Sequence, residues 1–212
     1  MPVVGMIQVQ NQYILDVKPF KPISLAPFFS MPAPMPGGLS PALIADLRSD
    51  HAGEVGAVAI YRGVLAISRD AGLRAFAQRH LLTEARHQRV IECWLPGPQR
   101  SRLLPGWRVA GWLTGALPAM LGPRAVYATV AAVEVFVDQH DADPLRRIDA
   151  APAHALLPLL RRDLADCQAD ECQHRDEALA RQGDRPVSAW LRGWTLLVGR
   201  GSAVAVALAR RW

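Results

Sequence analysis

Two Glu-x-x-His pairs, each preceded at long range by a lone glutamate, constrain the fold of this chain more than any other feature. Residues three apart lie on the same side of an α-helix, so each pair presents a carboxylate and an imidazole to the same neighbour. The lone glutamates stand in apolar stretches that also read as helices. The six side chains are Glu54, Glu84, His87, Glu134, Glu171 and His174.

The order Glu, Glu-x-x-His, Glu, Glu-x-x-His is the ligand set of a carboxylate-bridged dinuclear metal site in a four-helix bundle. Two such helices packed face to face bring their pairs to a shared point, and Glu54 and Glu134 are then expected to bridge two metals. Oxygen-rich ligation with one imidazole per metal suits iron or manganese better than zinc. Four carboxylates among apolar residues would be unfavourable without a cation. We therefore expect two iron ions per chain.

Prolines and glycines divide the chain into an arm and a helical domain. Residues 1–38 contain repeated prolines and end in Gly37-Gly38, which predicts a Pro-rich irregular arm. Ser40 is the expected N-cap of the first helix, with Pro41 at its first position. Residues 39–212 are long enough for one domain with a sizeable core.

Six helices are predicted in that domain and no sheet, because no stretch shows sustained two-residue alternation. Four of the helices carry the ligands, and the remaining two are unusually apolar. The expected fold class is all-α: a ferritin-like four-helix bundle with two additional apolar helices. The predicted helices cover residues 41–68, 71–95, 107–121, 123–141, 153–183 and 186–212.

The net charge of +5 comes almost entirely from arginine, since Lys18 and Lys21 are the only lysines. No basic stripe with interleaved aromatics is present, so nucleic acid is not an expected partner. Three cysteines without metal-type spacing, Cys93, Cys167 and Cys172, are expected to be reduced thiols.

The two additional helices combine tryptophan with flanking arginine, a pattern that favours contact with a membrane surface. The uncharged apolar runs are shorter than the roughly 18 residues of a membrane-spanning helix. A signal peptide is not expected, because the N-terminal residues do not combine a basic leader with an apolar segment. We expect a peripheral protein on the cytoplasmic face of the cell (inner) membrane. Covering the bundle or forming a dimer face is the alternative role for these helices. The arginines expected to meet anionic headgroups are Arg192, Arg200, Arg210 and Arg211.

Several segments resemble the demethoxyubiquinone hydroxylase family. DHAGEVGA at 50–57 is similar to that family's first ligand helix, AAVE at 131–134 to its third ligand segment, and EXXHXD at 171–176 to its last. The apolar stretch 107–122 is similar to the family's third helix. The resemblance covers residues 43–212 and fills all six ligand positions.

This resemblance implies an oxygen-dependent hydroxylation of the ring of 3-demethoxyubiquinol, a demethoxylated ubiquinone precursor, in ubiquinone biosynthesis. It implies a di-iron monooxygenase whose partners are O2 and a precursor with an isoprenoid tail. Apolar helices suit a substrate whose tail stays in the bilayer. A homo-oligomer or an accessory lipid-binding protein would fit the same surface.

Polar residues near the ligands are candidates for supporting roles. Tyr61 lies seven positions after Glu54 and is expected near the site, with a plain core tyrosine as the alternative. The family resemblance places His140 near the site as a hydrogen-bond partner. Asp50 and Asp176 are expected either to orient imidazoles or to be solvated charges. The histidines without a partner at ligand spacing, expected to be structural or exposed, are His51, His80 and His154.

The chain departs from the family pattern at Val55, Val135 and Asp141, which are expected to lie around the ligands and in the pocket wall and so to bear on substrate identity. Two other classes of function stay open. One is another ferritin-like di-metal protein, such as a tRNA hydroxylase, a peroxide-handling enzyme or an iron-storage relative. The other is a non-catalytic membrane-associated module that binds quinone or lipid.

Overall fold

The computed structural model describes residues 39–152, 155–184, 186 and 188–212, without the side chains of 138–143. The predicted irregular arm at 1–38 lies outside the described residues. The described part is helical and contains no strand, which confirms the all-α class. The elements are α1 Pro41–Ile67, α2 Ala71–Trp94, η3 Gly97–Gln99, α3 Leu104–Ala119, α4 Pro123–Asp149, α5 Leu157–Gln182 and α6 Ala189–Ala209.

Short polar side chains and glycine define the helix ends. Ser40, Asp70 and Ser188 are the N-caps of α1, α2 and α6, and each accepts a hydrogen bond from the main-chain N–H three positions on. Gly183 ends α5 with a φ of +70°, a conformation that glycine adopts without strain. The Ser40 and Gly183 ends agree with the predicted boundaries, because capping is a local property, whereas α6 begins at Ala189 rather than at the predicted residue 186.

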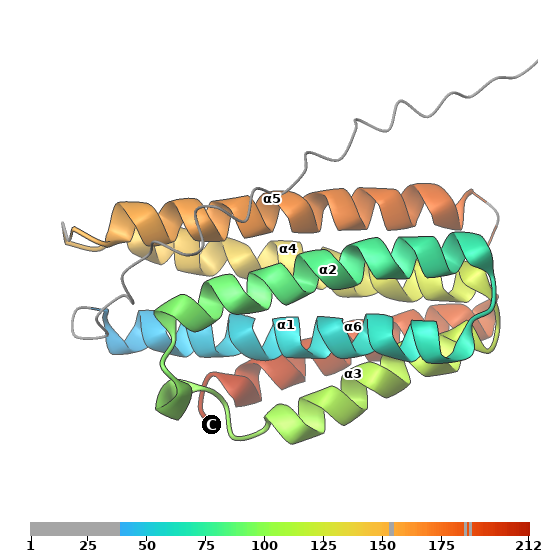
Figure 1. The fold of residues 1–212 in the computed structure, drawn as a ribbon, viewed down its shortest axis with the longest axis horizontal. Helices are drawn as coiled ribbons and strands as arrows, with labels where there is room; N and C mark the ends of the chain where they lie inside the picture. The colour runs from blue at the N-terminus through green and yellow to red at the C-terminus, as the bar shows by residue number, and fades with distance from the viewer. Residues whose placement is uncertain (1–38, 153–154, 185, 187) are drawn as a thin grey trace, which may run out of the picture. The chain divides into compact units, whose positions relative to one another are not determined.

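Helices α1, α2, α4 and α5 form the four-helix bundle, in which α1 packs against α2 and α4 packs against α5 (Figure 1). Helix α3 lies along α1, and α6 packs against both α4 and α1. Helices α3 and α6 make little or no contact with each other. The two additional apolar helices therefore lie on the bundle rather than within it.

The bundle core consists of two apolar clusters with a polar band between them. One cluster contains Tyr61, Phe76 and Tyr127, and the other contains Leu47 and Leu160. Each of the four bundle helices contributes residues to both clusters, which lie on either side of its ligand position. The apolar clusters thus hold the four helices at a fixed spacing around the ligand side chains.

Helix α4 continues past Pro144 to Asp149, beyond its predicted end at residue 141. Proline disfavours a helix interior because it lacks the N–H donor and crowds the preceding turn. Here Ile148 is buried and Leu145 packs beside it in the cluster with Leu47 and Leu160. Burial of these apolar side chains outweighs the local cost of the proline.

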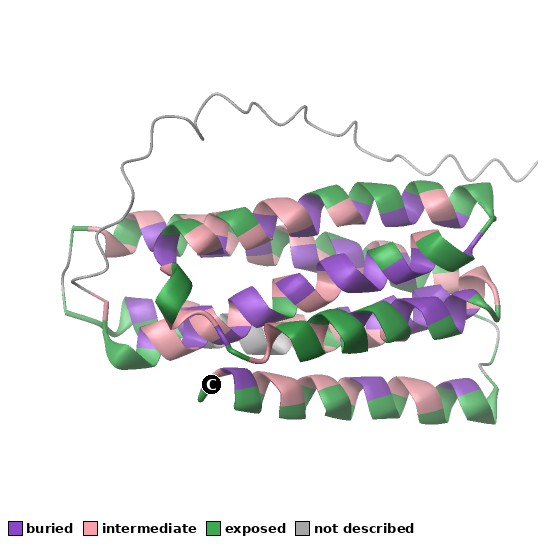
Figure 2. Ribbon diagram, turned by 60° about the horizontal axis from the view of Figure 1, so that its bottom comes forward, coloured by how far each residue is buried: buried purple, intermediate pink, exposed green. Residues whose placement is uncertain are grey.

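Many apolar side chains on α3 and α6 are exposed, and Figure 2 shows exposed residues along both helices, α6 being the one that ends at C. Within the described ranges, none of the helices has the length and apolar character needed to cross a membrane. The large exposed apolar residues of this surface are Val109, Trp112, Leu113, Leu117, Met120, Leu121, Trp190, Leu196, Leu197, Val204, Leu208 and Trp212.

Candidate metal centre

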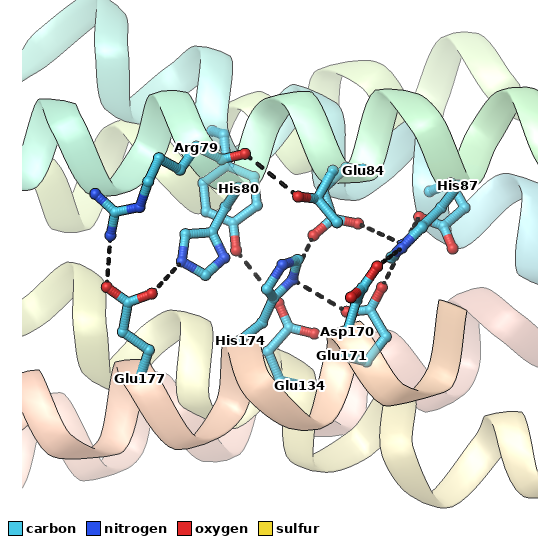
Figure 3. Close-up of polar contacts among 12 residues, drawn as sticks. Arg79, His80, Glu84, His87, Glu134, Asp170, Glu171, His174 and Glu177 are labelled. Atoms are coloured by element: carbon cyan, nitrogen blue, oxygen red, sulfur yellow. Dashed lines mark hydrogen bonds and ion pairs between the residues drawn. The ribbon is translucent and has the colours of Figure 1, made fainter. Parts of the chain in front are cut away.

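All six predicted ligand side chains meet in the polar band of the bundle. Their ligand atoms form two groups, and within each group the atoms lie within 4.8 Å of one another. Figure 3 shows the facing pairs from α2 and α5, with Glu134 of α4 beside them. One group is Glu54, Glu84, His87 and Glu171, and the other is Glu84, Glu134, Glu171 and His174.

Glu84 and Glu171 belong to both groups, whereas Glu54 and Glu134 each belong to one. This grouping favours Glu84 and Glu171 as the shared ligands, in place of the expected bridging by Glu54 and Glu134. The Glu-x-x-His helices face each other across the centre, so their glutamates occupy the position between the two groups. Glu54 and Glu134 each belong to only one of the two groups, on the side of that group that faces away from the other group.

The imidazoles point their Nδ1 atoms at carboxylates on the opposite helix. His87 Nδ1 lies 2.7 Å from Glu171 Oε1, and His174 Nδ1 lies 2.9 Å from Glu84 Oε1. None of these four atoms has a partner with hydrogen-bond geometry. Buried polar atoms that converge without hydrogen bonds fit metal ligands, because a cation would satisfy all of them together.

Burial shapes the protonation of the outer glutamates. Burial is the largest cause that raises the pKa of Glu54 and of Glu134 well above the ordinary value. The neighbouring carboxylates Glu84 and Glu171 raise both pKa values further. Without a cation, the two outer carboxyl groups therefore tend to keep their protons.

The inner glutamates and the histidines behave in the opposite way. Burial opposes ionisation of Glu84 and Glu171, but contacts with His87 and His174 outweigh it and lower the pKa of both carboxyl groups. Burial likewise opposes charge on the imidazoles, yet the carboxylates raise the pKa of His174 to about 9 and that of His87 well above its ordinary value. Protons compensate the charge here, and a cation would displace them.

Asp170 lies beside the candidate centre, although no sequence pattern predicted it there. Its Oδ2 lies 3.1 Å from His87 Nε2, and the same oxygen is ion-paired with Arg86. A carboxylate on Nε2 holds the ring so that Nδ1 faces the centre. Asp170 directly precedes a ligand on α5, and its approach to a ring on another helix has no local sequence signal.

Tyr61 lies near the site, as its spacing from Glu54 predicted. It is fully buried, and its hydroxyl donates to Glu134 Oε1 at 3.4 Å. Burial raises the pKa of Tyr61 well above its ordinary value, and the Glu134 carboxylate adds to this. Tyr61 therefore acts as a neutral donor to an outer glutamate.

The two histidines outside the ligand set that can be placed are structural. His51 Nε2 lies 3.1 Å from Glu92 Oε1, and His80 Nε2 lies 3.0 Å from Glu177 Oε2 (the latter pair in Figure 3). Both rings are buried. His154 and the side chain of His140 lie outside the described residues.

The remaining candidate residues differ in whether they lie near the centre. Asp176 is 68% exposed and bonded to Arg175, so it is a solvated charge and does not orient an imidazole. Asp50 lines a cavity beside the centre. Val55 is buried and Val135 is exposed, and neither lines that cavity, so these two departures from the family pattern lie outside the pocket wall. The Asp141 side chain lies outside the described residues.

The cavity has a volume of about 350 Å³ and is lined by residues of α1, α3, α4 and α6 together with all four glutamates of the centre. Its walls combine apolar side chains such as Phe136 and Val198 with small residues such as Gly56 and Ala205. Some lining residues are exposed, Leu197 among them, so the cavity reaches the surface. Its size is within the range of small-ligand sites, about 300–1,000 Å³.

Sequence comparison places these features in a family. Residues 42–209 match the family described as ubiquinone biosynthesis protein COQ7. The 3-demethoxyubiquinol 3-hydroxylase of Rhodospirillum rubrum is 36% identical over 149 residues, which cover 67% of each chain. The NADPH-dependent 3-demethoxyubiquinone 3-hydroxylase, mitochondrial, of Dictyostelium discoideum is 28% identical over 78% of this chain and 75% of its own. The Homo sapiens protein of the same description is 29% identical over 78% of this chain and 76% of its own.

The match extends from the first turn of α1 to the last residue of α6 and includes every helix that supplies a ligand or a cavity wall. The chain therefore belongs to the ubiquinone biosynthesis protein COQ7 family.

Proposed function

We propose that this protein is a di-iron monooxygenase that hydroxylates the ring of a demethoxylated ubiquinol in ubiquinone biosynthesis. The observation that carries the proposal is a cavity whose apolar walls end on the four glutamates of the centre. An aromatic ring placed there would contact both the walls and the reacting centre. The names of the relatives support this substrate, and family membership favours it over the other two classes of function.

Two iron ions are the proposed cofactor, one for each group of ligand atoms. Glu84 and Glu171 would be shared, and each ion would take one histidine and one outer glutamate as well. When bound, reduced iron supplies the electrons that O2 needs to react with an organic ring. Carboxylate-rich ligation with a single imidazole per metal suits iron.

The protein's own residues prepare the site in three ways. Asp170 holds the ring of His87 with Nδ1 toward the centre. The Tyr61 hydroxyl orients the Glu134 carboxylate through its hydrogen bond. Apolar side chains such as Phe136 and Val137 line the cavity next to Glu134 and exclude water from the reacting ring.

We further propose that α3 and α6 dock on the cytoplasmic face of the cell membrane. Their exposed tryptophan, leucine and valine side chains support this, because each buried CH2 contributes about 0.8 kcal/mol. The cavity reaches the surface at residues of these helices, where an isoprenoid tail in the bilayer could lead the ring inward. A second copy or an accessory lipid-binding protein would cover the same apolar surface.

Complementation tests the reaction. A strain lacking this protein should accumulate the demethoxylated quinone, read by mass spectrometry, and the intact chain should restore ubiquinone. Glu134→Ala should fold but fail to rescue, since it removes an outer ligand. Normal ubiquinone in the deletion strain, with no second hydroxylase present, would contradict the assignment. Rescue by Glu134→Ala would instead favour a non-catalytic module.

Metal analysis of anaerobically purified protein tests the cofactor. We expect about two irons per chain and loss of most of this iron in the double variant His87→Ala/His174→Ala. His51→Ala is the control, because His51 is buried and bonded to a carboxylate but lies outside both ligand groups. Stoichiometric zinc, or iron retained in the double variant, would count against the site.

Sedimentation with anionic liposomes tests the docking surface. Leu113→Glu on α3 and Leu196→Glu on α6 place charge on exposed positions that do not line the cavity, so binding should weaken while iron content stays the same. Leu82→Glu on α2 is the matched control, since Leu82 is 66% exposed outside this surface. Equal binding by all variants would show that α3 and α6 do not dock on lipid.

A further inference from the structure

A second hollow lies apart from the metal centre and shares no lining residue with the cavity above. Its volume is about 280 Å³. Four of its six lining residues are arginines, contributed by α1, by the connector after η3 and by the residues that follow α6. The arginine pocket, as we call it, is lined by Arg48, Pro98, Arg100, Arg102, Arg211 and Trp212.

Hydrogen bonds to main-chain oxygens join the segments of the arginine pocket, which lie far apart in the sequence. Arg48 donates through Nε to the carbonyl oxygen of Gln99 at 2.6 Å and through Nη1 to that of Arg210 at 3.2 Å. The main-chain N–H of Arg102 donates at 2.8 Å to a main-chain oxygen of Trp212, which belongs to the α-carboxylate of the last residue of the sequence. The three segments are therefore tied together, and the positions of the arginines around the hollow follow from the fold.

The charge of the arginine pocket is only partly compensated. Arg100 lies 3.2 Å from Glu92 Oε1, but this carboxylate also accepts from Gln88 and lies beside His51. The α-carboxylate of Trp212 adds one negative charge to the wall, but in the part of the chain that the structure describes no Asp or Glu side chain is ion-paired with Arg102 or Arg211, so the four arginines exceed the acidic groups. Like charges gathered around one hollow repel each other, and an anion inside it would offset this repulsion.

A phosphate group matches this arrangement. Guanidinium groups offer planar pairs of N–H donors that bind phosphate oxygens in a bidentate manner. The hollow is large enough for a tetrahedral anion. Arg48 and Arg100 are held by other partners, so the exposed side chains of Arg102 and Arg211 are the ones available to bind it.

The surroundings favour a lipid phosphate over a soluble one. Trp212, in the pocket wall, is 60% exposed, and Val204 and Leu208 on the preceding turns of α6 are exposed as well. Tryptophan and arginine together are typical of the level of lipid headgroups. Arg210, expected to meet headgroups, is instead ion-paired with the buried Asp46 and so is not part of the pocket.

We propose that the arginine pocket binds the phosphate of an anionic phospholipid at the end of the apolar surface of α3 and α6. The pocket would add headgroup recognition to apolar docking and would set which end of α6 meets the headgroups. The lipid assignment rests on the proposed membrane docking, whereas anion binding by the pocket is independent of the metal centre and of the reaction.

The test uses the full, metal-loaded protein and two kinds of phosphate. Partition to phosphatidylcholine vesicles with and without phosphatidylglycerol is compared for the intact protein and for Arg102→Gln/Arg211→Gln. We expect the double variant to lose about tenfold or more in partition to the anionic vesicles only. The control Arg69→Gln/Arg89→Gln removes the same charge from exposed positions outside the pocket and should change partition little.

Inorganic phosphate distinguishes the source of the anion. If phosphate raises the melting temperature of the intact protein but not of Arg102→Gln/Arg211→Gln, while vesicle partition is equal for both, the pocket takes a soluble anion and the lipid proposal is wrong. Equal behaviour of the two proteins in both assays overturns the site altogether. Neither assay requires turnover, so loss of the proposed enzymatic function would not affect these readings.

Discussion

Glu177 is a carboxylate outside the metal centre that three donors hold in place. Arg79 Nη2 lies 2.6 Å from its Oε1, Arg181 Nε lies 2.7 Å from the same oxygen, and His80 Nε2 lies 3.0 Å from its Oε2. The buried ring of His80 in turn lies 4.1 Å, centroid to centroid, from that of His174. Glu177 thus fixes an imidazole that packs on a metal-ligand candidate.

The pKa of Glu177 makes its contribution to stability pH-dependent. Partial burial opposes ionisation, but the contacts with His80 and Arg181 outweigh it and lower the pKa from 4.5 to about 2. A carboxyl group with a lowered pKa in the folded state stabilises the protein above its unfolded pKa, and this stabilisation disappears as the pH falls through the folded pKa. The sensitive window for Glu177 is therefore about pH 4.5 down to 2.

Glu177→Gln should lower the free energy of unfolding at pH 7, and the difference from the unchanged protein should shrink as the pH falls below 4.5. Urea unfolding of the metal-free protein at several pH values measures it. Asp176→Asn, at an adjacent but 68% exposed carboxylate, is the control and should show a small effect. A difference that stays constant between pH 3 and 7 would contradict the electrostatic role of Glu177.

At the scale of helices, the glycines of α1 and α3 fall into two classes. A Cβ added at Gly115 would overlap the carbonyl of Ile60, and one added at Gly63 would overlap that of Trp112. These glycines let α3 lie directly against α1. A Cβ added at Gly56 would meet no atom within 4 Å, and Gly56 lines the cavity. Gly56 therefore leaves open space beside the metal centre.

Gly56→Ala should leave the melting temperature equal or higher, because alanine favours a helix interior by about 0.5–1 kcal/mol. The added methyl group should narrow the cavity, so KM for the quinol should rise while iron content stays unchanged. Gly193→Ala, an exposed α6 position with nothing within 4 Å, is the control without cavity contact. An unchanged KM for Gly56→Ala would show that this position does not shape the site.

Gly115→Ala should instead destabilise the protein by about 1–3 kcal/mol through overpacking.

At the scale of the whole molecule, the proposed metal ions would connect all four bundle helices. The candidate ligands come from α1, α2, α4 and α5, and five of the six are buried. Binding to the folded state alone stabilises it, by about 2.7 kcal/mol at a metal concentration one hundred times the dissociation constant. The centre therefore contributes to stability as well as to the proposed chemistry.

Removal of metal by chelation should lower the melting temperature by about 5–10 °C, as expected for a chain of this length. The shift should be smaller at lower pH, because His174, with a pKa of about 9, and His87, with a raised pKa, increasingly retain protons that compete with the cation. Calorimetry at pH 6 and pH 8 measures both effects. The double variant His87→Ala/His174→Ala provides the control, since chelation should no longer shift its melting temperature. A shift that is equal in the control would mean that the metal stabilises the protein elsewhere.

The sequence alone determined the all-helical class, several helix ends and the candidate ligand set. Helix caps such as Ser40 and the three-residue spacing of Glu84 and His87 are local properties, so they can be recognised without knowing how the helices pack. The spacing of Tyr61 from Glu54 was equally informative, because residues seven apart on a helix share a face.

Only the tertiary structure decided the relations between helices. It placed Glu84 and Glu171 rather than the lone glutamates between the two ligand groups. It paired Asp170 with His87 and tied Arg210 to Asp46. It also carried α4 past Pro144, because the burial of Ile148 depends on side chains from other helices. Each outcome depends on residues distant in the chain, whose contacts are set by packing and burial and leave no periodic signal in the sequence.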